Sequence, residues 1–195
     1  MATMILLPDG SGGHTFHWAN AGGATHQLSL SSDDGDASYV VCSATGRRLD
    51  ITFANPSVAE ADIASPGGIT SVRFLSSGRS THRTTDSEVD IKFLTPTDYG
   101  EETVSYDKHA SDYETINGTA RTTSNGSSAW SYANLENLSL RMTKNGTIEV
   151  RVSYLAIEVT YTPVGYTHDV TGIDSGDISK VSGILTSDIS KVNGI

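Results

Sequence analysis

Apolar and polar residues alternate along most of this chain, and the apolar spacing of an amphipathic helix is almost absent. The clearest segment, 148–161, places apolar side chains at every second position over two stretches: Ile148, Val150 and Val152, then Leu155, Ile157, Val159 and Tyr161. Alternation of this kind predicts a β-strand with one buried face. The phase of the alternation changes once near Ser153 and Tyr154, which predicts a β-bulge there.

Shorter alternating segments predict further strands, and turn-forming residues separate them. We expect strands at 4–7, 27–30, 38–42, 49–53, 69–75, 88–94 and 102–106. Leu138, Leu140 and Met142 alternate ahead of Asn145-Gly146, a dipeptide suited to a tight turn, so we expect the last two strands to pair antiparallel. Many short strands at this spacing predict an all-β, antiparallel β-sandwich of jelly-roll-like form.

One short helix is predicted in the segment AWSYANLENL, residues 129–138. Ser131 is a suitable N-cap, and Leu135 and Leu138 have the spacing to face inward. The helix would close one end of the sandwich.

The composition of the sequence changes after Pro163, where aromatic residues become rare and copies of a short sequence repeat begin. DISKVSGI at 177–184 returns as DISKVNGI at 188–195, and a weaker copy, VTGI, ends at Ile173. We therefore divide the chain into a β-sandwich domain, 1–163, and an extended C-terminal arm, 164–195.

A segment such as this arm buries too little apolar surface by itself to offset the entropy cost of ordering its backbone. We expect it to dock on a sister subunit, on a neighbouring protein or on the chain's own sandwich, by adding a strand to a sheet edge. A simple flexible tether is the alternative. The predicted assembly interface consists of the apolar residues of the copies: Val170, Ile173, Ile178, Val181, Ile184, Ile189, Val192 and Ile195.

Composition and charge exclude several classes of function. The 195 residues include 23 acidic and 13 basic side chains, so the formal charge of -10 disfavours nucleic acid as a partner. No apolar run approaches the roughly 20 residues of a membrane helix, and the first residues lack the pattern of a signal peptide, so we expect the chain to be made and assembled in cytoplasm, with no membrane partner. Cys42 is the single cysteine, which excludes an intrachain disulfide and suggests a small side chain packed in a strand.

Motifs of catalysis and cofactor binding are missing from the sequence. There is no nucleophile elbow, phosphate-binding loop or HExxH helix. We predict no enzymatic activity, no cofactor and no metal. The stretch SSDDGD, with Asp33, Asp34 and Asp36, is interpreted as a solvated turn rather than a Ca²⁺ loop. His14, His17 and His26 lack the spacing of a zinc site.

Aromatic residues offer a rival function from another class, because exposed rings form the binding platforms of many sandwich lectins. The candidates for sugar contact are Trp18, Tyr99, Tyr106, Tyr113 and Trp130. The alternative is that the two tryptophans close the core at the ends of the domain.

The order of these parts resembles a β-sandwich module of tailed-bacteriophage structural proteins. It begins with MATMILLPDGSG, a tryptophan and GGATH, continues with DDGD and ITSVRFLSSGR, and ends with AWSYANLENLSLRM and EVRVSYLAIEVTYTP. Phrases such as ISKVNGI are similar to those near the ends of phage tail, collar and head-accessory proteins. The resemblance spans about residues 1–163 and brings no catalytic residues.

The resemblance implies a non-enzymatic structural component of a virion, in head decoration or as a neck or tail accessory protein. The implied partners are other copies, in a trimer or another small ring, and virion proteins such as the major capsid, neck or tail proteins. The rival reading is a carbohydrate-binding tail-fibre or receptor-binding domain.

Overall fold

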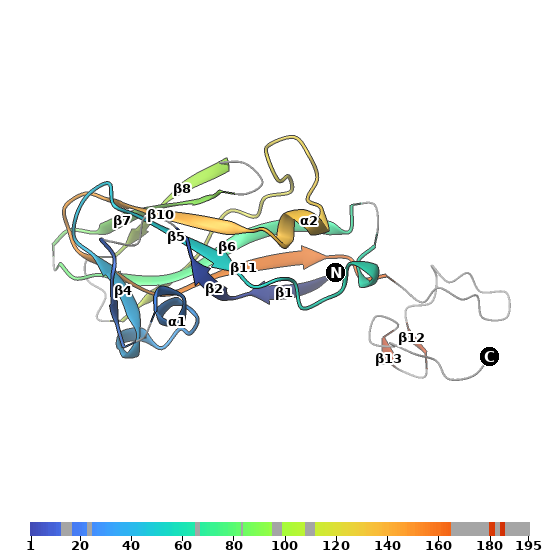
Figure 1. The fold of residues 1–195 in the computed structure, drawn as a ribbon, viewed down its shortest axis with the longest axis horizontal. Coiled ribbons are helices and arrows are strands. Elements are labelled where there is room, and N and C mark those ends of the chain that lie inside the picture. Colours follow the sequence, from blue (N-terminus) through green and yellow to red (C-terminus); the bar gives the residue numbers. More distant parts are fainter. Residues whose placement is uncertain are drawn as a thin grey trace.

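Two antiparallel β-sheets packed face to face form the body of the protein in the computed structural model (Figure 1). The structure describes residues 1–12, 17–22, 25–64, 67–82, 84–94, 99–107, 112–164, 180–181 and 184–185. All of the strand pairs in these residues are antiparallel, and the predicted all-β, jelly-roll-like sandwich is confirmed.

The first sheet is built around the long strand β11. Its strand order is β3-β4-β11-β6-β9, and β1 also pairs with β11 beyond the end of β4. These strands are β1 (Ala2–Leu6), β3 (Ala19–Ala21), β4 (Tyr39–Cys42), β6 (Ile69–Ser80), β9 (Glu114–Asn117) and β11 (Val150–Tyr161).

The second sheet has the order β2-β5-β10-β7-β8 and covers the apolar face of the first. Its strands are β2 (Pro8–Ser11), β5 (Arg48–Phe53), β7 (Ser87–Phe93), β8 (Tyr99–Tyr106) and β10 (Ser139–Asn145). Sequence patterns missed β2, β3 and β9, because none of these short strands carries a run of alternating apolar residues.

The core lies between the sheets and is filled by the inward side chains of each strand. Leu140 and Met142 on β10 and Val152, Leu155 and Ile157 on β11 are completely buried. The predicted bulge is confirmed, because the register between β11 and β6 shifts between Val152 and Tyr154. Cys42 is free and buried, as expected.

The predicted pairing of the last two strands is wrong. β10 pairs with β5 and β7 in the second sheet, while β11 pairs with β4, β1 and β6 in the first. The chain bends after Asn145, with a positive φ at Gly146, and the segment 146–149 carries it from one sheet to the other. Both edges of each strand are already occupied by other partners, so the turn residues alone do not decide the pairing.

Two short α-helices accompany the sheets, together with 3-10 turns η1 (Gly35–Ala37) and η2 (Glu60–Asp62). Helix α2 (Tyr132–Leu135) is the predicted helix: Ser131 caps it, and Leu135 and Leu138 are buried. The strand expected at 27–30 is instead helix α1 (His26–Leu30). Four residues are too few to distinguish the two periods. No helix among the described residues is long and apolar enough to span a bilayer.

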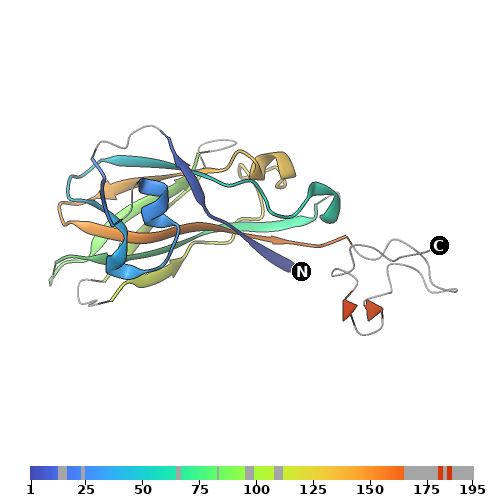
Figure 2. The same cartoon turned by 60° about the horizontal axis from the view of Figure 1, so that its bottom comes forward.

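Strand β1 leaves one row of apolar side chains outside the core. Met4 and Leu6 point inward and are buried, whereas Ile5 and Leu7 are 42% and 41% exposed and Met1 is 93% exposed. We call Met1, Ile5 and Leu7 the β1 row. The amino terminus lies beside the end of β11, where Ala2 pairs with Tyr161 (Figures 1 and 2).

Only a small part of the predicted arm is described. β12 (Lys180–Val181) pairs with β13 (Ile184–Leu185) in a sheet of two strands. Val181 and Ile184 of the predicted interface are register partners in this pair. Val170, Ile173, Ile178, Ile189, Val192 and Ile195 lie outside the described residues.

Candidate functional site

Three of the five aromatic residues predicted to contact sugar are buried in the core. Trp18, Tyr106 and Trp130 present no ring face to solvent, and each polar atom has a partner inside the protein. The indole N–H of Trp130 donates to the carbonyl of Arg121 at 2.8 Å, and its ring packs edge-on against Phe93. The tryptophans therefore close the core, which was the alternative interpretation.

Of the remaining two candidates, Tyr113 lies at the surface and the side chain of Tyr99 lies outside the description. Tyr113 directly precedes β9 and is half-buried on the outer face of the first sheet. Its hydroxyl donates to Oδ1 of Asp36 at 3.1 Å. This contact joins a predicted aromatic residue to the acidic turn.

The acidic turn SSDDGD is fixed by its own side chains, in agreement with the solvated-turn interpretation for Asp34. That carboxylate accepts hydrogen bonds from the backbone N–H of Ser38 at 3.0 Å and from its hydroxyl at 2.8 Å. Asp33 accepts from the hydroxyl of Ser153 at 3.4 Å. Among the described residues there is no group of three or more His, Cys, Asp or Glu side chains arranged to hold a metal ion.

Asp36 is bound to two arginines that stand side by side on the first sheet. Arg151 of β11 and Arg79 of β6 are register partners, so both guanidinium groups project from the same outer face. Arg79 donates to Oδ1 of Asp36 at 2.9 Å and Arg151 donates to the same oxygen at 3.2 Å. One carboxylate oxygen thus collects three hydrogen bonds, two of them from cations.

Each arginine also lies against a tyrosine ring. The guanidinium carbon of Arg79 is 5.3 Å from the centre of the Tyr113 ring, and that of Arg151 is 4.7 Å from the centre of the Tyr39 ring. Such cation–π contacts hold the planar groups in fixed orientations. We call Tyr39, Asp36, Arg79, Tyr113 and Arg151 the Asp36 cluster.

The Asp36 cluster remains accessible, since the Asp36 side chain is 55% exposed. Burial and the negative charge of Asp36 raise the pKa of Tyr113 above its ordinary value. Its hydroxyl therefore stays protonated and continues to donate at neutral and moderately alkaline pH. Two guanidinium groups against one carboxylate leave the Asp36 cluster with an excess of positive charge, in a chain whose formal charge is -10.

Ser77 and Tyr154 extend the outer face beside the cluster. They are register partners on β6 and β11, and Ser77 projects away from the core, because its neighbour Ser76 points inward to Tyr106. Ser77 is completely buried, and its hydroxyl has no hydrogen-bond partner in the part of the chain that the structure describes. Burial and the charge of Asp33 raise the pKa of Tyr154.

The outer face of the second sheet differs in chemistry. Arg141 makes a two-bond ion pair with Asp50, at 2.7 and 2.8 Å, and Thr103 donates to Asp90 at 2.7 Å. The outward positions of β5, β10 and β7 carry charged residues, Ser, Thr and Asn and no aromatic residue. Among the described side chains of these sheets, the arginines on the first sheet lie against tyrosine rings, whereas the outward positions of β5, β7 and β10 pair Arg141 with a carboxylate and carry no tyrosine.

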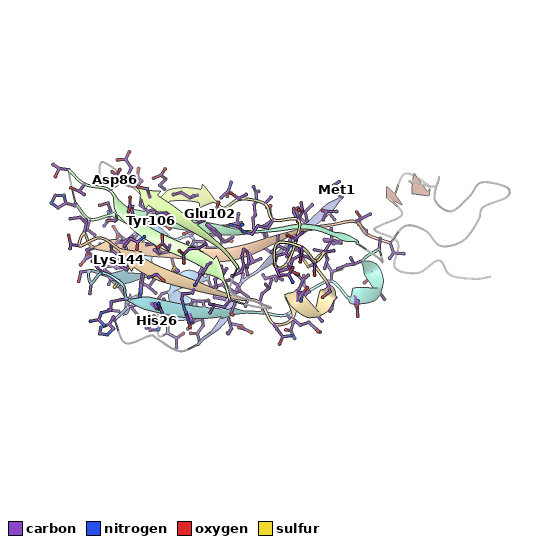
Figure 3. All side chains as sticks on the ribbon, turned by 90° about the horizontal axis from the view of Figure 1, so that it is seen from above. Met1, His26, Asp86, Glu102, Tyr106 and Lys144 are labelled. Atoms are coloured by element: carbon purple, nitrogen blue, oxygen red, sulfur yellow. The ribbon has the colours of Figure 1, made fainter. Side chains whose placement is uncertain are left out.

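A buried lysine occupies the end of the core far from Met1 (Figure 3). The ammonium group of Lys144 donates to the carbonyl of Asn145 and, at 3.3 Å, to that of Gly146. Burial lowers the pKa of Lys144. The backbone carbonyls replace its water shell, so this side chain closes the end of the sandwich.

His17 and His26, two of the three histidines judged to lack the spacing of a zinc site, do not form a cluster in the described residues. His14 lies outside them, and His17 is exposed. His26 shares a hydrogen bond of 2.7 Å between its Nε2 and the carbonyl of Trp18. That contact ties α1 to the preceding segment.

Sequence reasoning missed Tyr39, Arg79 and Arg151. Arg79 and Arg151 stand at outward positions of strands that it did predict or nearly reach, within SSGRS and EVRVS. The alternation identified their face, but not the register that makes them neighbours. Predicting the site would have required the register between β6 and β11, which pairs Arg79 with Arg151.

No protein-family model matches the sequence, and no curated protein matches it. Solved structures with a similar fold include the CBM36-1 domain of a multidomain xylanase from the hindgut metagenome of Trinervitermes trinervoides. The two sequences are 12% identical, the match covers 84% of this chain and 100% of that chain, and the TM-score is 0.43. The CBM35 domain from Paenibacillus barcinonensis matches at 14% identity, 79% of this chain, 100% of that chain and a TM-score of 0.36. The Agl-KA catalytic domain matches at 10% identity, 88% of this chain, 30% of that chain and a TM-score of 0.44.

Proposed function

We propose that this domain is a non-enzymatic module that binds carbohydrate on the outer face of its first sheet. The observation that supports the proposal is the Asp36 cluster, in which a half-exposed carboxylate, two guanidinium groups and two tyrosines are fixed on one sheet face. The partly exposed side chain of Tyr154 lies on the same face.

Sugars present a dense array of hydroxyl groups and an apolar ring face, and both must compete with water. A site for them therefore needs planar polar groups that are already ordered and an aromatic surface next to them. The donors described above, Arg79, Arg151 and Tyr113, all bond Oδ1 of Asp36. Because the Asp36 side chain is 55% exposed, its carboxylate is accessible as an acceptor for a sugar hydroxyl. The guanidinium groups add donors in fixed directions.

A glycan array probed with the full chain tests this proposal. We expect binding to at least one class of glycan, and loss of that signal in Asp36→Ala. Asp90→Ala is the matched control, because Asp90 also accepts a side-chain hydrogen bond at an outer sheet face, but on the second sheet. Absence of any array signal for the unaltered chain, or equal signals for both variants, would overturn the proposal.

A structural role in a virion is the second candidate, and the exposed β1 row favours it. The order of parts over residues 1–163 and the terminal copies suggest this role, with capsid, neck or tail proteins as partners. The two candidates are compatible in a receptor-binding component of a particle. Mass spectrometry of purified particles tests the virion role, and absence of the chain from them would exclude it.

A further inference from the structure

The β1 row is unusual for the outer face of a sandwich. Met1, Ile5 and Leu7 are three of the four large hydrophobic residues that are exposed in the described part of the chain, and the fourth is Leu28 of α1. A single exposed apolar side chain is common, but Ile5 and Leu7 are exposed two residues apart, and Met1 is exposed at the start of the same segment, beyond Thr3. The solvent face of a sheet normally carries polar residues, as the second sheet does.

The same strand also has a free edge. Within the described residues β1 pairs with β11 alone, from Ala2 opposite Tyr161 to Leu6 opposite Ile157. Alternate residues of β1 consequently direct their N–H and C=O groups away from β11. Charged residues, proline or a bulge usually protect such an edge, and the sequence ATMIL has none of the first two and pairs without a register shift.

The C-terminal copies have the composition to cover this edge. Each complete copy, 177–184 and 188–195, contains apolar residues together with one aspartate and one lysine, so its formal charge is zero. In a chain of charge -10 the copies can therefore approach another molecule without strong repulsion. The described residues of the first copy, Lys180–Val181 and Ile184, lie in short paired strands, and strand conformation is what pairing with a sheet edge requires.

The number of copies favours an occupant from another molecule. β1 is five residues long, while the copies recur every 11 residues, so one edge can hold only one of them. The arm thus has more edge-binding segments than its own β1 can accept. We propose that the β1 row and the free edge of β1 bind a C-terminal copy of a second molecule of this chain.

This contact joins two different surfaces, an arm and an edge. Contacts of that type close into a ring when the rotation between subunits permits it, and otherwise produce a filament. A trimer or another small ring is the closed form. The proposal is independent of carbohydrate binding, which involves the Asp36 cluster on other strands.

Sedimentation velocity of the full chain at increasing concentration tests the proposal. We expect the unaltered chain to associate and the double variant Ile5→Lys, Leu7→Lys to remain monomeric, because two lysines replace the apolar contact surface. Both side chains are exposed, so the substitution leaves the core intact. The double variant Val181→Asp, Val192→Asp, with one change in each complete copy, should also remain monomeric. Leu28→Lys is the matched control and should associate as the unaltered chain does.

Mixing the two double variants is the decisive measurement. The first retains a functional arm and the second a functional edge, so the mixture should form a one-to-one complex that neither variant forms alone. A monomeric unaltered chain at all concentrations, undiminished association of either double variant, or a mixture that stays monomeric would overturn the proposal. Glycan binding of the Ile5→Lys, Leu7→Lys variant should be unchanged, which separates this test from that of the proposed function.

Discussion

Replacing Tyr106 by phenylalanine tests the assignment of this residue to the core. Tyr106 is completely buried, and its hydroxyl shares a hydrogen bond with the hydroxyl of Ser76, which is also completely buried. Phenylalanine keeps the ring and removes only the hydroxyl. The variant therefore loses one buried hydrogen bond and leaves Ser76 without its partner.

The expected loss of unfolding free energy follows from these two effects. Removal of one partner of a buried hydrogen bond costs about 1–3 kcal/mol, because the other partner stays desolvated. We expect about 2 kcal/mol for Tyr106→Phe and a similar loss for Ser76→Ala. The double variant removes both polar groups and should lose only about 1 kcal/mol, so the coupling free energy is on the order of 3 kcal/mol.

Urea unfolding followed by tryptophan fluorescence provides the measurement, since Trp18 and Trp130 are both buried and report on loss of the core. In thermal unfolding each single variant should lower the Tm by roughly 4–8 °C. Additive losses in the double variant would refute the reasoning. Carbohydrate binding should be the same in Tyr106→Phe and the unaltered chain. A change in binding would indicate that Tyr106 contacts sugar, against its assignment to the core.

Three further outcomes follow from the structure. Gly78→Ala should reduce the free energy of unfolding by about 1–3 kcal/mol, measured in urea. The reason is that an added Cβ would lie 2.6 Å from the Tyr106 ring and 2.9 Å from the carbonyl oxygen of Arg151. An unchanged free energy of unfolding would contradict this packing. Ser131→Ala should cost about 1 kcal/mol, since Ser131 and Asn134 form a capping box at α2, whereas Ser131→Asp, which keeps a cap, should cost less. Burial raises the pKa of Tyr106, so unfolding favours its ionisation and stability should fall as the pH rises above about 10, by up to about 1.4 kcal/mol per pH unit. Tyr106→Phe should reduce that slope in unfolding measurements at several pH values, and an identical slope would show that other groups cause it.

Local sequence patterns predicted the fold class because alternation is a property of each strand by itself. The bulge beside Ser153 and the helix capped by Ser131 were found for the same reason: a phase change and a cap are each visible within a few residues. The strand predicted at 27–30 was wrong because four residues do not distinguish a helix from a strand.

The candidate site was harder to predict, because its members come from four separate segments. Asp36 and Tyr113 were noticed for their residue types, in a turn and among the aromatics, with no indication that they touch. Arg79 and Arg151 become neighbours only through the register of β6 and β11. Trp130, by contrast, resembles a surface platform in sequence and is a core residue in space.

The sequence by itself determined which face of each strand is apolar, where the phase slips and where turns occur, since these depend on residues close together in the chain. Tertiary structure decided which strands are neighbours, and therefore that the chain passes from one sheet to the other at Asn145-Gly146. It also decided the burial of Lys144 among carbonyl groups, the contacts of the Asp36 cluster and the exposure of the β1 row. The physical reason is that a strand's own hydrogen-bonding groups are the same whatever its partner. The partner is selected by packing of the whole core, which no short segment contains.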